Sequence, residues 1–185
     1  MNPRALFLDR DGVINVDRGY VGRQEDFTFI EGIFDLCRLA VRMKYLLIVV
    51  TNQAGIGRGF YTEADFRKLT EWMCEQFRWA GVNISAVYHC PDHPEFGLGE
   101  YRRESPNRKP NPGMILQAAS DFNLDLSRSI ILGDKVSDIQ AGKAAGVGRC
   151  WLLSNDEQGD VRSADRLVRD LSEASRVLEA EGIEN

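Results

Sequence analysis

Two aspartates separated by a single residue follow a short apolar segment near the start of the chain. Residues 5–8 are all apolar, and Asp9, Asp11 and Gly12 come soon after them. An uninterrupted apolar run predicts a strand buried on both faces, and in open parallel sheets ligands bind beyond the carboxyl ends of the strands. Two acids there repel each other unless a cation or a shared proton offsets their charge, and Mg²⁺ prefers such oxygen ligands. The alternative is a solvated loop with two surface acids, and this segment alone favours neither interpretation.

Three predicted strands end in polar side chains that could act together. These side chains are Asp9 and Asp11 after residues 5–8, Thr51 and Asn52 after residues 45–50, and Asp134 and Lys135 after residues 129–132. Parallel strands place their carboxyl ends at one edge of the sheet, so we expect these residues to converge. One polar strand end could arise by chance, but three that together hold acids, a hydroxyl group and a lysine indicate a site.

Strands and helices are predicted to alternate along the chain. Further strands are expected at 85–89 and 148–152, and apolar spacing and helix-start signals predict helices at 31–43, 62–79, 113–122, 136–145 and 167–179. This order predicts one α/β domain over residues 1–185, with a doubly wound, mainly parallel five-stranded sheet and helices on both faces. Residues 54–59, 90–112 and 156–165 are expected to be loops, and residues 181–185 a frayed tail.

The composition argues against several classes of protein. The 185 residues carry a net charge of -5 and have no long basic run, which argues against a nucleic-acid-binding surface. No apolar stretch approaches the roughly 20 residues that cross a membrane, and charged residues interrupt the segment where a signal peptide would need an apolar core. The four cysteines have no close pairs, as is typical of reduced thiols. We therefore expect a cytoplasmic protein, and a monomer, with no nucleic-acid or membrane partner.

Four separated motifs resemble those of the haloacid dehalogenase (HAD) superfamily of phosphotransferases. They read Leu8-Asp9-Arg10-Asp11-Gly12, Val50-Thr51-Asn52-Gln53, Lys109-Pro110 and Gly133-Asp134-Lys135-Val136-Ser137-Asp138. The chain is also similar to the bacterial heptose bisphosphate phosphatases and their histidinol-phosphatase relatives. That similarity rests on Asn15, Gly19-Tyr20-Val21, residues 51–56, Cys90-Pro91 and residues 108–114, and the resemblance as a whole extends to about Leu153.

The resemblance implies a Mg²⁺-dependent phosphatase that acts on a small phosphorylated sugar. The implied substrate is D-glycero-D-manno-heptose 1,7-bisphosphate, which would lose its 7-phosphate on the way to nucleotide-activated heptose for surface polysaccharide such as lipopolysaccharide. Histidinol phosphate, or another small sugar phosphate, is the alternative substrate. A receiver-like phosphoacceptor domain is the alternative outside the enzymes, but the Asp9/Asp11 pair on the first strand and the chain length argue against it.

The resemblance also implies catalytic roles for the acids. Asp9 would attack phosphorus to form an aspartyl-phosphate, and Asp11 would protonate the departing sugar oxygen and later deprotonate water. Asp9, Asp134 and the backbone carbonyl of Asp11 would hold Mg²⁺. Asp138 would support the metal ligands from outside.

Other residues are expected to bind the substrate. They are Thr51 and Lys109 for the non-bridging oxygens of the reacting phosphate, Arg108 and Lys135 for a second phosphate or merely for solvent, and Asn52 and Gln53 for sugar hydroxyls or turn caps. The lysine and arginine assignments are the ones for which a solvated side chain is the main alternative.

The loops predict an open site. About eighteen residues separate Asp11 from the first predicted helix, which is too few for the large cap domain that this fold family usually carries. We therefore expect residues 54–59 and 90–107 to form the rim of the site.

The long loop departs from the resembling enzymes, most of which bind a structural zinc there through Cys-x-His and Cys-x-Cys. This chain has Cys90-Pro91-Asp92-His93 and Ser105-Pro106-Asn107 instead. A closed zinc site needs four sulfur or nitrogen ligands, so no structural zinc is expected. Phe96 and Tyr101 are expected to pack where the metal would be.

Overall fold

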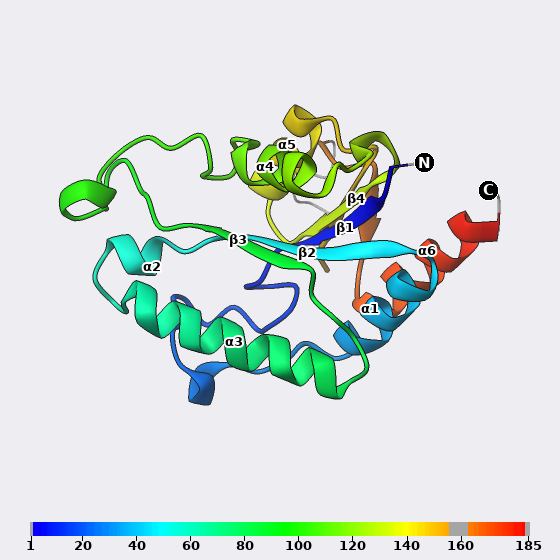
Figure 1. Ribbon diagram of the computed structural model, residues 1–185, viewed down its shortest axis with the longest axis horizontal. Coiled ribbons are helices and arrows are strands. Elements are labelled where there is room, and N and C mark those ends of the chain that lie inside the picture. Colours follow the sequence, from blue (N-terminus) through cyan, green and yellow to red (C-terminus); the bar gives the residue numbers. More distant parts are fainter. Residues whose placement is uncertain (1, 156–162, 184–185) are drawn as a thin grey trace.

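The computed structural model describes residues 2–155 and 163–183, which form helical layers on both sides of a parallel sheet (Figure 1). The sheet has six strands in the order β3-β2-β1-β4-β5-β6. They are β1 (Arg4–Leu8), β2 (Tyr45–Asn52), β3 (Ala86–Cys90), β4 (Ile130–Gly133), β5 (Arg149–Leu153) and β6 (Arg166–Val168). The doubly wound fold class is confirmed, with six strands in place of the expected five.

The strand order reverses at β1, and this places three carboxyl ends side by side. β1 pairs in parallel with β2 on one side and with β4 on the other, so that Leu8 lies opposite both Val49 and Leu132. The residues that follow these three strands therefore emerge together, at the point where sheets of this kind bind ligands.

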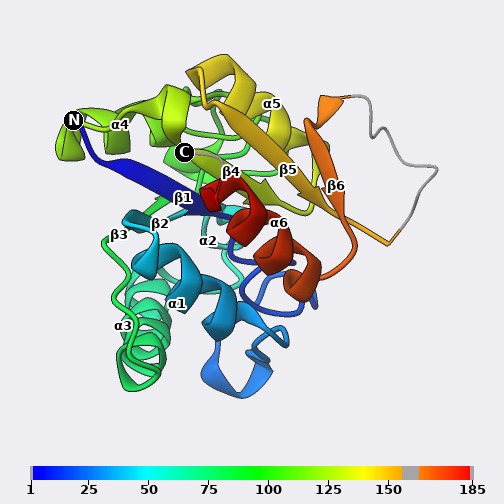
Figure 2. The ribbon, with the colours of Figure 1, turned by 90° about the vertical axis from the view of Figure 1, so that its right-hand side faces the viewer.

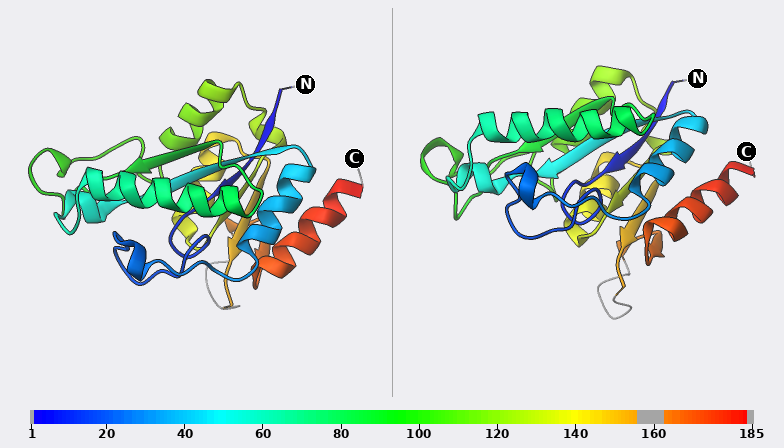
Figure 3. Two further views of the ribbon diagram at one scale, coloured as in Figure 1. Left: turned by 60° about the horizontal axis from the view of Figure 1, so that its bottom comes forward. Right: turned by 90° about the horizontal axis from the view of Figure 1, so that it is seen from below.

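Helices cover both faces of the sheet (Figures 1 and 3). They are α1 (Ile33–Arg42), α3 (Glu63–Trp79) and α6 (Leu171–Ile183) on one face, and α4 (Gly113–Phe122) and α5 (Val136–Ala145) on the other. Side chains of β1 alternate between two cores: Leu6 and Leu8 pack toward the first group of helices, and Ala5 and Phe7 toward the second. This burial on both faces explains why the strand has no polar alternation.

The boundaries of α3 follow from local signals. The Thr62 side chain accepts a hydrogen bond from the Asp65 amide (3.1 Å), and the Asp65 carboxylate accepts one from the Thr62 amide (2.8 Å). This capping box satisfies two amides at the start of the helix. The helix ends at Trp79, and Gly81 follows with φ +77, a conformation that favours glycine.

Residues 54–59 are not a loop throughout, as the sequence predicted, because Ala54–Gly57 form the short helix α2. A Cβ atom at Gly55 would overlap the Tyr61 ring, and one at Gly57 would overlap the Pro91 carbonyl oxygen. These glycines therefore permit close packing. The high glycine content of residues 54–59 wrongly predicts an irregular backbone.

The end of the chain also differs from the prediction of one helix at 167–179. Residues 166–168 form β6 beside β5 (Figure 2), and α6 begins at Leu171 and continues to Ile183. The Asp170 carboxylate accepts a hydrogen bond from the Glu173 amide (2.7 Å), which fixes the start of the helix. A three-residue strand is too short to show a period. Residues 156–162 and 184–185 of the predicted loop and tail lie outside the described residues.

The segment between β1 and α1 has one short 3-10 helix, Gln24–Asp26. A segment with this single short helix is too small to be the large cap domain that the fold family usually carries. None of the helices in residues 2–155 and 163–183 combines the length and the apolar character needed to cross a membrane.

Truncation of Phe77 tests the core beneath α3. Its side chain is fully buried and its ring lies 5.0 Å from Phe34 and 5.9 Å from Phe29, measured between centroids. We expect Phe77→Ala to lower the free energy of unfolding by about 3–5 kcal/mol, because it leaves a cavity. Trp79→Ala, at a side chain that is 78% exposed, is the matched control and should change it by less than about 0.5 kcal/mol. Equal losses in urea denaturation would contradict this packing.

Candidate active site

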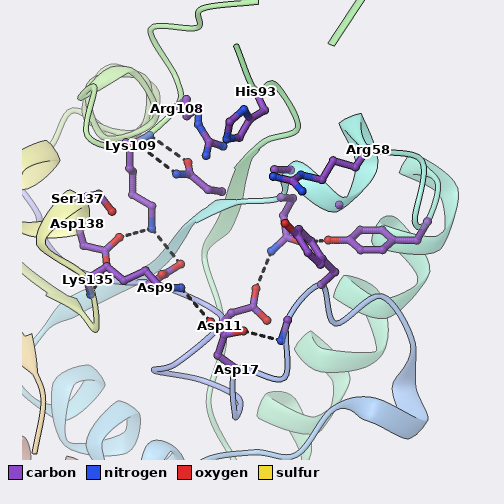
Figure 4. A pocket seen from close by; sticks show the side chains of 17 residues that line it. Asp9, Asp11, Asp17, Arg58, His93, Arg108, Lys109, Lys135, Ser137 and Asp138 are labelled. Carbon is purple, nitrogen blue, oxygen red and sulfur yellow. Dashed lines mark hydrogen bonds and ion pairs between the residues drawn. The ribbon is translucent and has the colours of Figure 1, made fainter. Parts of the chain in front are cut away.

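A pocket of about 490 Å³ lies at the carboxyl ends of β1, β2 and β4 (Figure 4). Eight of the predicted site residues line it: Asp9, Asp11, Asn52, Gln53, Arg108, Lys109, Lys135 and Asp138. The other two, Thr51 and Asp134, are close behind the lining. Thr51 bonds to Gln53, which lines the pocket, and Asp134 has a carboxylate oxygen near those of Asp9 and Asp138. The structure thus brings the predicted residues together.

A buried lysine lies at the centre of the acids. Lys109 Nζ is 3.0 Å from a carboxylate oxygen of Asp9 and 2.6 Å from one of Asp138, and it donates a hydrogen bond to the Val50 carbonyl oxygen (2.8 Å). Burial alone would lower the pKa of Lys109, but the Asp138 and Asp9 carboxylates raise it above its ordinary value. The lysine therefore remains charged and links β1, β2 and α5.

The acids next to this lysine hold their protons more tightly than free carboxyl groups do. Burial, together with the Asp138 and Asp134 charges, raises the pKa of Asp9 to about 7, although Lys109 opposes the shift. Burial and the Asp138 charge likewise raise the pKa of Asp134 to about 6. Each shift means that ionising the carboxyl group costs free energy in the protein alone, so a cation at this place would be stabilised.

The donor set fits Mg²⁺. Oxygens of Asp9, Asp134 and Asp138 all lie within 4.8 Å of one another, and one buried Asp134 oxygen has no hydrogen-bond partner. Three carboxylates and the Lys109 ammonium leave a formal excess of two negative charges, which one divalent cation would balance. Gly12 admits this arrangement, because a Cβ atom there would overlap the Asp134 carboxylate. Oxygen-only ligands of this kind are those of Mg²⁺.

Asp11 has surroundings unlike those of Asp9. The buried guanidinium of Arg10 donates to both carboxylate oxygens of Asp11, at 3.1 Å from Nε and 3.0 Å from Nη2. The side-chain amides of Asn15 (3.0 Å) and Gln53 (2.9 Å) each donate one further hydrogen bond to the same group. Asp11 is therefore fixed by hydrogen-bond donors, whereas Asp9 is fixed by a lysine among other acids.

The last two residues of β2, Thr51 and Asn52, form hydrogen bonds with their neighbours. The Thr51 hydroxyl accepts a hydrogen bond from the Gln53 amide (2.8 Å). Asn52 forms two hydrogen bonds of 3.0 Å with the backbone of Lys109, one as donor and one as acceptor. These contacts hold the backbone at Lys109 against the end of β2. They favour a structural role for Asn52 over contact with a sugar hydroxyl. Its role toward a ligand stays a prediction.

Two arginine side chains and an imidazole lie on the far side of the pocket from Asp11 and Asp17. Figure 4 shows Arg108, His93 and Arg58 there. Arg108 donates to the Asp92 backbone carbonyl (3.1 Å), and the Arg58 guanidinium lies over the Phe96 ring at 4.2 Å from its centroid. Burial and the neighbouring Arg58 lower the pKa of Arg108, against the Cys90 thiol, which raises it. Two guanidinium groups that repel each other favour an anion between them.

Lys135 lies at another edge of the pocket. Its Nζ is 2.9 Å from the Asp17 carboxylate and 3.9 Å from that of Asp134. Burial lowers its pKa, but Asp134 and Asp17 together raise it above the ordinary value. Lys135 is therefore paired rather than merely solvated. Its role toward a phosphate stays a prediction.

Residues 13–30 contribute to the rim in addition to the two predicted loops. Asp17, Gly19 and Tyr20 line the pocket beside residues 54, 55 and 58 and His93. No periodicity distinguished this segment in the sequence. The sequence also did not predict that Tyr61 lines the pocket, or that Arg10 pairs with Asp11. For the second of these, the alternating charges of residues 9–11 were an available signal.

An ion pair and hydrogen bonds of side chains contribute to holding the 90–107 loop. The Asp92 carboxylate is buried and forms an ion pair with Arg103 (3.1 Å). His93 Nδ1 accepts hydrogen bonds from the Glu95 and Phe96 amides, both at 3.2 Å. The Cys90 thiol lies 3.9 Å from the Asp92 carboxylate, and Ser105 and Asn107 stand where the resembling enzymes have thiolates, so these residues do not fit a closed zinc site. Phe96 is 52% exposed, and its ring packs at a tilt against that of His93, with centroids 4.8 Å apart, instead of filling the loop.

Known proteins are similar to this chain along most of its length. A sequence family described as HAD-hydrolase-like matches residues 106–174. The D-glycero-alpha-D-manno-heptose-1,7-bisphosphate 7-phosphatase of Burkholderia mallei is 57% identical over 168 residues, which are 91% of this chain and 89% of the relative. The D-glycero-beta-D-manno-heptose-1,7-bisphosphate 7-phosphatase of Vibrio cholerae is 51% identical over 160 residues, which are 84% of this chain and 86% of the relative.

A solved structure has the same fold. The D,D-heptose 1,7-bisphosphate phosphatase of B. bronchiseptica, complexed with magnesium and phosphate, superimposes with a TM-score of 0.83 and 26% identity over 96% of this chain and 99% of its own. The identity to the two relatives is high and spans most of both chains. The chain therefore belongs to the D-glycero-D-manno-heptose-1,7-bisphosphate 7-phosphatase family of HAD-like hydrolases.

Proposed function

We propose that this protein is a Mg²⁺-dependent phosphatase that removes the 7-phosphate of D-glycero-D-manno-heptose 1,7-bisphosphate, in the cytoplasm, as a step toward nucleotide-activated heptose. The observation that carries the proposal is the Asp9/Asp11 pair, in which one acid faces a buried lysine and the other faces hydrogen-bond donors. The relatives named above support the choice of sugar.

The chemistry assigned to Asp9 is nucleophilic attack. An Asp9 carboxylate oxygen forms a bond to phosphorus while the bond from phosphorus to the sugar oxygen breaks. Lys109, 3.0 Å from the carboxylate, keeps the nucleophile in place and offers positive charge to the phosphate oxygens. Mg²⁺, held by Asp9, Asp134 and the Asp11 carbonyl, would offset the charge of the phosphate when bound.

The chemistry assigned to Asp11 is proton transfer. In the first step Asp11 gives its proton to the departing sugar oxygen. In the second step it takes a proton from the water that attacks phosphorus and releases Asp9. The two acids lie two residues apart on one strand end, so both reach the same substrate without a moving domain.

The cationic side of the pocket suits the second phosphate of a bisphosphate. Arg108 and Arg58 both line the pocket there, and a planar guanidinium can bind a phosphate through two hydrogen bonds. This arrangement favours a bisphosphate over histidinol phosphate, whose amino group is positively charged. A comparison of kcat/KM for the two anomers of the heptose bisphosphate, heptose 7-phosphate and histidinol phosphate tests the proposal, and equal or higher activity on histidinol phosphate would contradict it.

Substitution of the nucleophile should abolish turnover. We expect Asp9→Asn to lower kcat by about a thousandfold or more, because a neutral amide cannot form the aspartyl-phosphate. Asp35→Asn, at an exposed acid on α1, is the control and should retain full activity. Phosphate release and circular dichroism are measured together. Activity above about one percent of wild type in a folded Asp9→Asn protein would refute the assignment.

Substitution of Arg108 should discriminate between substrates. We expect Arg108→Ala to lower kcat/KM for the bisphosphate roughly ten- to a hundredfold, as the loss of a charged bidentate contact does, and to lower it far less for heptose 7-phosphate. The exposed neighbour Arg102 provides the control Arg102→Ala. Equal losses on both substrates would mean that Arg108 serves the reacting phosphate or only the loop.

The long loop should fold without zinc. We expect less than one zinc per chain by elemental analysis, and a thermal midpoint that a zinc chelator leaves unchanged when Mg²⁺ is in excess, because the Asp92–Arg103 pair and the His93 turn supply the contacts. One tightly bound zinc per chain, released by Cys90→Ser, would show that the loop is a metal site after all.

A further inference from the structure

Gln53 lies between the proposed acid and base, Asp11, and the proposed phosphate-binding hydroxyl of Thr51. Its side-chain amide nitrogen donates to Asp11 (2.9 Å) and to the Thr51 hydroxyl (2.8 Å). Gln53 is 1% exposed, and its backbone amide donates to the Cys90 carbonyl oxygen (2.7 Å). One rigidly held side chain therefore joins the proposed acid and base to the proposed phosphate-binding hydroxyl.

The amide has two ends, and Tyr61 selects between them. The Tyr61 hydroxyl donates to the Gln53 side-chain oxygen at 2.6 Å. The two N–H groups at the other end then match two acceptors, the Asp11 carboxylate and the Thr51 oxygen. If the amide were turned over, its oxygen would face the Asp11 carboxylate and both would be acceptors, so the Tyr61 contact favours the productive orientation.

Packing fixes Tyr61 itself. The ring lies between Gly22 and Gly55, and a Cβ atom at either glycine would overlap it. Gly22 belongs to the loop after β1, and Gly55 to α2. The ring thus has little room to turn, and its hydroxyl group remains aimed at Gln53.

We propose that Gln53 is a positioning residue for Asp11, and that the Tyr61 hydroxyl maintains the orientation of its amide. The inference rests on the proposed function, because it concerns the proton that Asp11 gives to the departing oxygen. Neither Gln53 nor Tyr61 needs to touch a reacting atom. A displaced Asp11 slows the transfer of phosphate from a substrate whose leaving oxygen must be protonated. It affects a substrate with a stable leaving anion much less.

The test compares two leaving groups. The value of kcat/KM is measured for a sugar monophosphate that the wild type hydrolyses and for 4-nitrophenyl phosphate, whose phenolate leaves without protonation. We expect Tyr61→Phe to lower kcat/KM for the sugar monophosphate about three- to tenfold, which is the effect of one lost neutral hydrogen bond. The value for 4-nitrophenyl phosphate should stay within about twofold of the wild type. Tyr88→Phe is the control, since it removes a hydroxyl of similar geometry that donates to Asp121 at 2.7 Å, outside the pocket.

A double-mutant cycle shows whether Tyr61 acts through Gln53. With Gln53→Met as background, Tyr61→Phe should have almost no further effect on the sugar phosphate. Equal losses on both substrates, full additivity in the cycle, or the same loss in Tyr88→Phe would overturn the proposal. If Gln53→Met does not fold, the leaving-group ratio of Tyr61→Phe decides alone. A failure of the heptose assignment would alter the ranking of substrates and leave this ratio intact.

Discussion

The buried ammonium group of Lys109 is the interaction on which the site depends. It contacts Asp9 at the end of β1 and Asp138 on α5, and it donates to the Val50 carbonyl oxygen of β2. These charges are almost completely excluded from water, so the loss of the lysine would leave an uncompensated buried charge, which typically costs about 3–5 kcal/mol. The same cluster retains an excess of negative charge through Asp134. A single arrangement thus positions the proposed nucleophile, Asp9, and creates a place that would suit a divalent cation.

The two neighbouring acids that follow β1 have different partners. Asp9 points toward Lys109 and the acid cluster, and Asp11 is held by Arg10, Asn15 and Gln53. Two acids in environments that differ this much can take different chemical roles at the same pH. The rim that surrounds them is made of loops instead of a cap domain. Arg108 lies on the long loop between β3 and α4 and is held there by its hydrogen bond to the Asp92 carbonyl oxygen (3.1 Å).

The sequence predicted the sheet, most helices and the convergence of the catalytic residues because those features have local signals. An apolar run predicts β1, and helix α5 has the predicted bounds because Gly146 ends it. Strand β6 was missed because three residues show no period, and α2 because its glycines serve packing against Tyr61 and Pro91. Asn15 and Gln53 donate to Asp11, and Tyr61 donates to Gln53. These residues are separated along the chain, so only the folded structure shows that they form one network.

The most direct test of the account is whether phosphate is attached to Asp9 during turnover. In Asp11→Asn the second step should be slow, because no base activates the attacking water. Rapid acid quench of this variant with 4-nitrophenyl phosphate, whose phenolate leaves without a proton from Asp11, followed by mass spectrometry of its peptides, should give one phosphoryl group on Asp9, in an amount close to one per chain. A protein that releases phosphate at a measurable rate with no phosphoryl group on Asp9, or with one on another residue, would contradict the account.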